Sequence, residues 1–192
     1  MGKGRLEAFS DGVIAVIITI MVLELRAPHG TELPVLVSLG PAFLTYALSF
    51  VFVGIYWVNH HHLLHAAPHI DGRVLWANLH LLFWISLIPF TTGWMGENNF
   101  ASAPTAVYGI SLLMPALAWQ VVQWKIVRAQ GHASTFARAI GRDLKGKISP
   151  ALYLVGIVLA FVDPPVACAM YLLVALMWLI PDRRIERAAQ RA

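Results

Sequence analysis

The stretch 5-RLEAFSDGVIAVIITIMVLEL-25 brings two charged residues, a serine and an aspartate directly before a run that carries no further charge until Glu24. An uncharged apolar run of this kind is typical of a helix that lies in a membrane. A signal peptide also begins with basic residues and an apolar run, but Asp11 interrupts the approach and no small-residue cleavage site follows Leu25. We therefore expect a retained membrane helix with a carboxylate at its entrance.

The composition favours an integral membrane protein over a soluble one. Of 192 residues, 58% are hydrophobic and 12% are charged, and the mean hydropathy is +0.67. A soluble domain normally has about 25% charged residues. The net charge of +4 is carried at the ends of apolar segments, without interleaved aromatic residues, so we expect a lipid bilayer and no nucleic acid as partner.

Cys168 is the single cysteine, which excludes an intrachain disulfide and a cysteine-based zinc cluster.

The hydropathy pattern predicts an all-α fold, a single six-helix transmembrane domain over residues 1–192. Turn residues such as those of the Asp163-Pro164-Pro165 run separate the apolar segments. A spanning helix needs roughly 17 to 25 residues, so the first, fifth and sixth segments span only if their polar flanks enter the interface. Otherwise they are re-entrant or tilted core helices. The expected helices cover residues 10–26, 41–62, 75–95, 104–126, 148–163 and 166–181.

The distribution of lysine and arginine predicts that both termini are cytoplasmic. With an even number of spans, the basic clusters fall on one side, and Arg26 is the single basic residue of the loops opposite. Basic residues accumulate on the cytoplasmic side of a membrane protein. The cytoplasmic set is Lys3, Arg5, Arg73, Lys125, Arg128, Arg138, Arg142, Lys145, Lys147, Arg183, Arg184, Arg187 and Arg191.

One face of the first helix is a candidate pore lining. Val16, Thr19 and Leu23 recur at helical spacing and so share one face, which carries one hydroxyl and no charge. From periodicity alone, packing against lipid or against other helices explains such a stripe better than a pore lining does.

The first helix begins with the motif Arg-x-x-x-Phe-Ser-Asp, formed by Arg5, Phe9, Ser10 and Asp11. Together with Trp-Val-Asn-His-His at 57–61 and Leu-Ile-Pro-Phe-Thr-Thr-Gly-Trp at 87–94, it resembles the bacterial relatives of the lysosomal and endosomal transmembrane potassium channel. The resemblance covers most of the chain and includes the number of helices.

The resemblance implies a potassium-permeable channel in a prokaryotic cytoplasmic membrane. Bacterial members are homotetramers in which the first helix lines the pore with rings of apolar and hydroxyl side chains. They lack the TVGYG filter, and this chain contains no such loop. The rings correspond here to Val16, Thr19 and Leu23, with Ile20 in place of Thr19 if the helix is rotated slightly. Such rings discriminate ions through the cost of partial dehydration. Val16 is smaller than the side chain expected at its position.

Asp11 needs a partner, because a carboxylate within a membrane is costly unless it is paired or hydrated. Three interpretations compete for it: cation attraction at the inner mouth, a proton relay with histidine, and a network that fastens the pore helix to its neighbours. The resemblance favours the last, because it places Arg5, Phe9, Ser10 and Asp11 in an interhelical network. The candidate partners lie at the same cytoplasmic depth and are Asn59, His60, His61, Trp76, Asn78 and His80.

Conduction is passive, so we expect no catalytic residue, enzyme activity, cofactor or bound metal, with K+ as the permeant ion. His61, His65 and His69 have helical spacing, but no cysteine or glutamate near them completes a metal site. Glu24 is a candidate for concentrating cations at the outer mouth.

The alternative function is a proton- or metal-coupled transporter that uses Asp11 and the histidines. Such a transporter would need polar ligands near mid-membrane, where residues 12–23 offer Thr19 alone.

Overall fold

The computed structural model describes residues 2–29, 31–67, 69–130 and 143–179, and every regular element in these ranges is a helix. The predicted all-α class is confirmed for this part of the chain. The helices are α1 (Lys3–Leu23), α2 (Leu33–Val37), α3 (Gly40–Ala66), α4 (Gly72–Ser86), α5 (Ile88–Glu97), α6 (Ser102–Gln130), α8 (Leu144–Leu159) and α9 (Pro164–Leu179).

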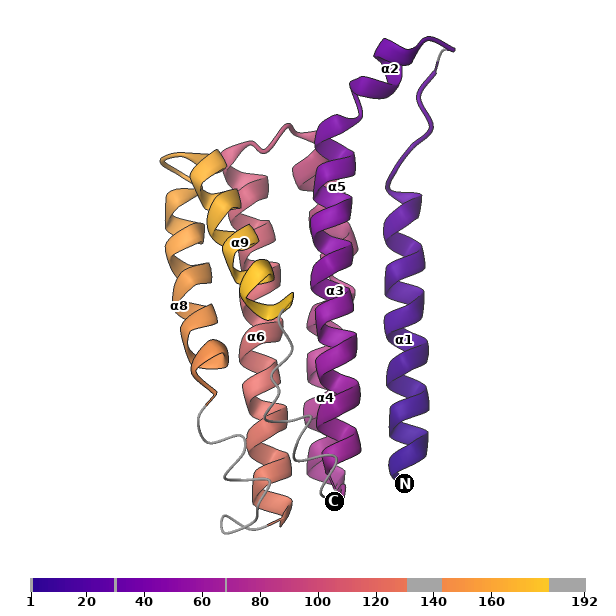
Figure 1. Ribbon diagram of the computed structural model, residues 1–192, viewed down its shortest axis with the longest axis vertical. Coiled ribbons are helices and arrows are strands. Elements are labelled where there is room, and N and C mark those ends of the chain that lie inside the picture. Colours follow the sequence, from indigo (N-terminus) through magenta and orange to yellow (C-terminus); the bar gives the residue numbers. More distant parts are fainter. Residues whose placement is uncertain (1, 30, 68, 131–142, 180–192) are drawn as a thin grey trace.

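The long helices run side by side in one bundle, with α1 at one edge and α8 and α9 at the other (Figure 1). The bundle axis is vertical in this view, and the short helix α2 lies at the top, in the connection from α1 to α3. Helices α8 and α9 reach only part of the height of the bundle. The arrangement leaves α1 with neighbours on one side only.

Within the described residues, four stretches are long and apolar enough to cross a membrane. They are Lys3–Leu23, Gly40–Ala66, the combined α4–α5 stretch Gly72–Glu97, and Ser102–Gln130. Helix α9 is apolar throughout but has 16 residues, as does α8. At about 1.5 Å per residue, 16 residues extend about 24 Å, less than the hydrocarbon thickness of roughly 30 Å.

Several helices extend further than hydropathy predicts. Helix α1 begins at Lys3 instead of residue 10, so Asp11 lies more than two turns inside the helix and not at its entrance. Helices α3 and α6 each extend four residues beyond their predicted ends at 62 and 126. The reason is that polar residues mark where the membrane begins, whereas good helix formers continue the helix into water. Residues 180 and 181, the predicted end of the last helix, lie outside the described residues, as do Arg138, Arg142 and the four arginines from Arg183 onward.

The predicted helix over 75–95 is interrupted, because α4 ends at Ser86 and α5 begins at Ile88. Pro89 has no N–H and cannot donate to a carbonyl of the preceding turn. Two hydroxyls then donate to the Ile88 carbonyl oxygen, that of Thr91 at 3.1 Å and that of Thr92 at 2.7 Å. These bonds pair the two hydroxyls within the helix without water, as a membrane interior requires.

Helices α6, α8 and α9 meet around the side chain of Tyr171, which is fully buried. Its hydroxyl donates to the Thr105 carbonyl oxygen at 3.3 Å. A methyl group on Gly109 of α6 would collide with this hydroxyl, and one on Gly156 of α8 would collide with the ring. Small residues of this kind allow membrane helices to approach closely.

Gly109→Ala therefore destabilises the protein. Overpacking costs about 1–3 kcal/mol, and each kcal/mol lowers the melting temperature by about 2–4 °C for a chain of this size. Gly54→Ala in α3 is the matched control, because a methyl group there meets nothing within 4 Å. Thermal unfolding in detergent measures both, and equal melting temperatures for the two variants would show that this packing is not tight.

Candidate functional site

Helix α1 has one buried face and one uncovered face. Leu6, Ser10, Ile14, Ile17 and Met21 are buried and are spaced by three or four residues. On the opposite side Val16 is 55% exposed and Leu23 is 74% exposed, and Thr19 and Ile20 are exposed as well. The residues predicted for the pore constriction therefore all lie on the face that the chain's own helices leave uncovered.

The hydroxyl of Thr19 is the polar group of this face, and it is bonded within its own helix. It donates to the Val16 carbonyl oxygen at 2.8 Å, within the same helix. Because its proton is used by the backbone, the oxygen presents lone pairs to whatever lies beyond the helix.

A buried chain of hydrogen bonds fastens α1 to α3 and α4. The Asn78 amide nitrogen on α4 donates to the Ser10 hydroxyl at 2.9 Å. The Asn78 amide oxygen lies 2.6 Å from Nε2 of His60 on α3. Ser10 and Asn78 are fully buried and His60 is 1% exposed. This chain joins three of the residues that the sequence analysis placed together.

Asp11 has a different partner from those predicted. The indole Nε1 of Trp57 on α3 donates to Oδ1 of Asp11 at 3.0 Å. Trp57 is 46% exposed, so this bond lies beside the buried chain and not within it. The available signal was the position of Trp57 in the Trp-Val-Asn-His-His run, one turn before His60.

The other predicted partners lie elsewhere. The Asn59 amide donates to the Ile55 carbonyl oxygen, His61 stacks on His65, and His80 accepts from the Trp84 indole. Trp76 is 75% exposed. Within the described part of the chain, neither Trp76 nor the Arg5 side chain forms a hydrogen bond or an ion pair, and Phe9 is 48% exposed.

Glu24 faces the bundle. A Cβ atom on Gly93 of α5 would lie 2.7 Å from Oε2 of Glu24, so the carboxylate rests against this glycine. Nearby in sequence, Arg26 pairs with Glu97 at 3.6 Å, and both side chains are well exposed. Glu24 thus fits closely against α5 at the end of α1 opposite Asp11.

Among the described residues, no three side chains of the His, Cys, Asp and Glu types come together as a metal site requires. The polar residues around α1 form hydrogen bonds between helices instead. The long apolar helices and this buried network define an integral membrane protein.

Comparison with known proteins identifies the class more closely. A sequence profile of the family described as "Endosomal/lysosomal potassium channel TMEM175" matches residues 5–89. A potassium channel from Chryseobacterium sp. is 52% identical over 98% of this chain and 98% of its own length. The chain therefore belongs to the TMEM175 family of membrane ion channels.

A solved structure supports the same assignment. The crystal structure of a lysosomal potassium-selective channel TMEM175 homolog from Chamaesiphon minutus has a TM-score of 0.81, with 28% identity over 94% of this chain and 97% of the other. The human protein named endosomal/lysosomal proton channel TMEM175 is 34% identical over 43% of this chain and 19% of its own length.

Ser10→Ala tests the buried chain of hydrogen bonds. The substitution leaves the buried Asn78 amide without its acceptor, which costs about 1–3 kcal/mol. Ser38→Ala is the control, because Ser38 is exposed and its hydroxyl donates to the backbone of its own turn. Thermal unfolding in detergent measures both variants; a Ser10→Ala protein as stable as the Ser38→Ala protein would show that the chain does not fasten α1.

Proposed function

We propose that the chain is one protomer of a homotetrameric, potassium-selective cation channel of a prokaryotic cytoplasmic membrane, with α1 lining the pore. The observation that best supports this proposal is the uncovered face of α1. Val16, Thr19 and Leu23 are exposed on this face, while the opposite face of the helix is buried. The potassium channels named among the relatives support the choice of ion.

A single α1 cannot surround an aqueous path, so the proposed pore requires several copies. Cyclic symmetry places the same face of each α1 around one axis and covers it at the same time. The proposed tetramer explains why Val16, Thr19 and Leu23 are exposed in one protomer. In the assembly, these side chains would face the same residues of the other protomers and the permeating ions instead of lipid.

The rings would select ions by dehydration. At about 1.5 Å per residue, the rings of Val16 and Thr19 lie about 4.5 Å apart along the helix, and those of Thr19 and Leu23 about 6 Å apart. The apolar rings offer no replacement for hydration water, which favours the ion that loses water more easily. At Thr19, the hydroxyl oxygen offers lone pairs to a cation because its proton is bonded to Val16. Ile20, 43% exposed, takes this place if α1 rotates in the assembled channel.

In the proposed topology, six helices cross the membrane and both termini are cytoplasmic. The start of α1, the end of α3, the start of α4 and the end of α6 lie together at the bottom of Figure 1. Basic residues lie at or near these ends, whereas Glu32, Glu97 and Asp163 belong to connections at the top. The short helices α8 and α9 would span with the help of their polar flanks or a locally thinner bilayer.

Asp11 and the buried network would hold the pore helix in place. The hydrogen bonds run from α1 to α3 through Trp57 and to α4 through Asn78. They fix the rotation of α1, and this rotation decides which side chains face the axis. Arg5 and Phe9, both exposed, remain candidates for contacts between protomers. Glu24 lies at the outer end of α1 but rests against Gly93 of α5, so it would attach this end of α1 to the bundle instead of lining the outer mouth.

The alternative is a proton- or metal-coupled transporter that uses Asp11 and the histidines. One observation supports proton movement in this alternative: animal relatives, such as the human protein, are named proton channels. A transport site needs several polar ligands near mid-membrane, and the uncovered face of α1 offers one, Thr19. The channel therefore has the better structural support, and proton flux belongs in its test.

Val16→Ala and Leu23→Ala should widen the constriction and reduce the preference for potassium over sodium. In planar bilayers with potassium on one side and sodium on the other, a tenfold loss of preference moves the reversal potential toward zero by about 59 mV. Val158→Ala in α8 is the control, because Val158 is 66% exposed and lies on another helix.

An unchanged reversal potential in both α1 variants would argue against this pore face. A wild-type protein that passes no current, but takes up substrate in liposomes along a proton gradient, would establish the transporter instead.

A further inference from the structure

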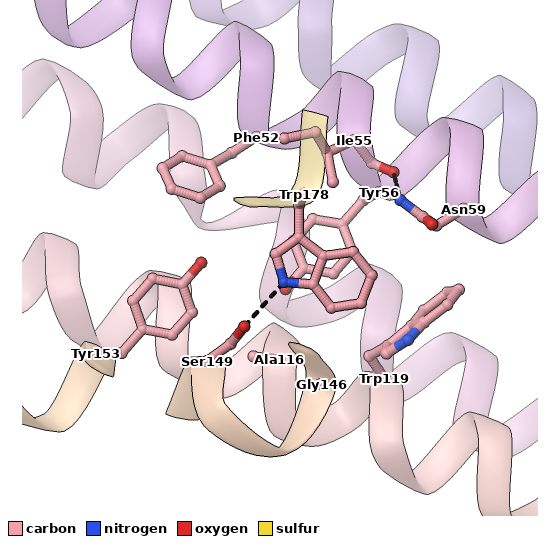
Figure 2. Close-up of a pocket in the computed structure, with 10 residues that line it drawn as sticks. All are labelled: Phe52, Ile55, Tyr56, Asn59, Ala116, Trp119, Gly146, Ser149, Tyr153 and Trp178. Atoms are coloured by element: carbon pink, nitrogen blue, oxygen red, sulfur yellow. Dashed lines mark hydrogen bonds between the residues drawn. The ribbon is translucent and has the colours of Figure 1, made fainter. Parts of the chain in front are cut away.

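The exposed residues of α6 all lie on one stripe of this helix. On its inner side, Ala116 and Trp119 border a small cavity shared with α3, α8 and α9 (Figure 2), and Trp119 is 3% exposed. The opposite side carries the exposed residues, which recur at helical spacing. They are Ile110, Leu117, Val121, Trp124 and Arg128. The stripe is therefore apolar over most of its length and ends in a cation.

Two cations lie over the ring of Trp124 near the end of α6. The guanidinium carbon Cζ of Arg128 is 4.2 Å from the ring centroid, and Nζ of Lys125 is 4.7 Å from it. A cation within about 6 Å of an indole face is attracted by the ring. Because Trp124 is 45% exposed, both charges are held beside a ring that is open to the surroundings.

Neither cation is paired with an acidic side chain in the described part of the chain. The ion pair found there joins Arg26 to Glu97. Residues 98–142 contain no acidic residue, so the next one along the chain after Arg128 is Asp143. Its carboxylate accepts from the Gly146 backbone N–H at 2.8 Å and from the Gln123 amide at 3.3 Å. The two positive charges beside Trp124 are therefore available to an anion.

The length of the stripe indicates what kind of anion fits. Eleven residues separate Ile110 from Val121, so the apolar part extends about 16 Å at ~1.5 Å per residue. This is close to half of the hydrocarbon thickness of roughly 30 Å, the depth of one leaflet. Tryptophan is enriched at the level of the lipid head groups, where Trp124 would then lie.

The charged end of the stripe matches a phosphate group. A guanidinium donates two parallel hydrogen bonds to phosphate oxygens, and an ammonium group adds a point charge. We propose that Trp124, Lys125 and Arg128 form a binding site for the head group of an anionic phospholipid, whose acyl chain lies along Leu117 and Val121.

The place of α6 in the bundle fits this ligand. In Figure 1, α3 lies between α1 and α6, so the stripe is remote from the proposed pore axis and would face lipid in the assembly. The end of α6 lies at the bottom of the bundle with the start of α1, which is the cytoplasmic side in the proposed topology. The ligand therefore belongs to the inner leaflet.

Native mass spectrometry of the purified protein tests the site. Titrations with dioleoylphosphatidylglycerol and with dioleoylphosphatidylcholine give the Kd of each lipid per protomer. A basic residue near a membrane surface contributes about fivefold to the affinity for anionic lipid. Arg128→Gln should therefore weaken phosphatidylglycerol binding about fivefold and leave phosphatidylcholine binding unchanged. Arg73→Gln is the matched control, because it removes one exposed charge at the start of α4, at the same end of the bundle.

Three results would overturn the proposal. Equal weakening by Arg73→Gln and Arg128→Gln would show a diffuse attraction between a positive surface and anionic lipid. Equal affinity of the wild-type protein for the two lipids would exclude selection of the anionic head group. Displacement of phosphatidylglycerol by glycerol 3-phosphate would identify a site for free phosphate instead of a lipid.

A second measurement uses the wild-type chain and so does not depend on the folding of a variant. Phosphatidylglycerol with a photoactivatable diazirine in its acyl chain should label the α6 peptide that contains Leu117 and Val121. Labelling confined to other helices would contradict the site. Neither measurement requires ion conduction, so the lipid site can fail while the proposed channel stands, and the reverse.

Discussion

The hydrogen bonds that hold α1 against its neighbours set the orientation on which the proposed pore depends. Asn78 lies between Ser10 of α1 and His60 of α3, and all three are buried. Because the bilayer interior holds no water, these polar groups can form hydrogen bonds only with one another. The distances and angles between them therefore tolerate little change. A rotation of α1 would break the bond to Ser10 and turn the face of Val16, Thr19 and Leu23 away from the proposed pore axis. Asp11 and Trp57 add a second attachment on the same side.

The remaining helices form a scaffold that uses hydroxyls and glycines where a soluble protein would use apolar burial alone. Ser49 of α3 lies 2.6 Å from the Thr92 hydroxyl of α5 and 2.9 Å from the Tyr108 hydroxyl of α6. Between membrane helices the hydrophobic effect gives little net attraction, so close packing and interhelical hydrogen bonds have to supply it. Thr92, three residues after Pro89, follows the same scheme, because its hydroxyl donates to the Ile88 carbonyl oxygen and also contacts Ser49 of α3.

The sequence predicted the helical class and the long apolar stretches of α3, α4–α5 and α6, because hydropathy reports the membrane directly. It did not predict that α1 begins at Lys3, since charge marks the membrane boundary and not the helix boundary. The pairing of Ser10 with Asn78 and His60 was within reach, because all three are polar at one depth of the bundle. The position of Trp57 one turn before His60 pointed to the same depth, but its pairing with Asp11 depends on the rotation of α3 about its axis, which the sequence does not give. The contact of Glu24 with Gly93 likewise depends on how closely α5 approaches α1.

The most direct test of the central proposal is cadmium block of a channel carrying Thr19→Cys in a Cys168→Ala background. If four copies of α1 surround the axis, the introduced thiols form a ring, and thiolates bind soft metal ions. Micromolar Cd²⁺ should then stop the potassium current, while the Cys168→Ala protein continues to conduct. A Thr19→Cys channel that conducts equally well with and without Cd²⁺ would show that this face of α1 does not line the pore.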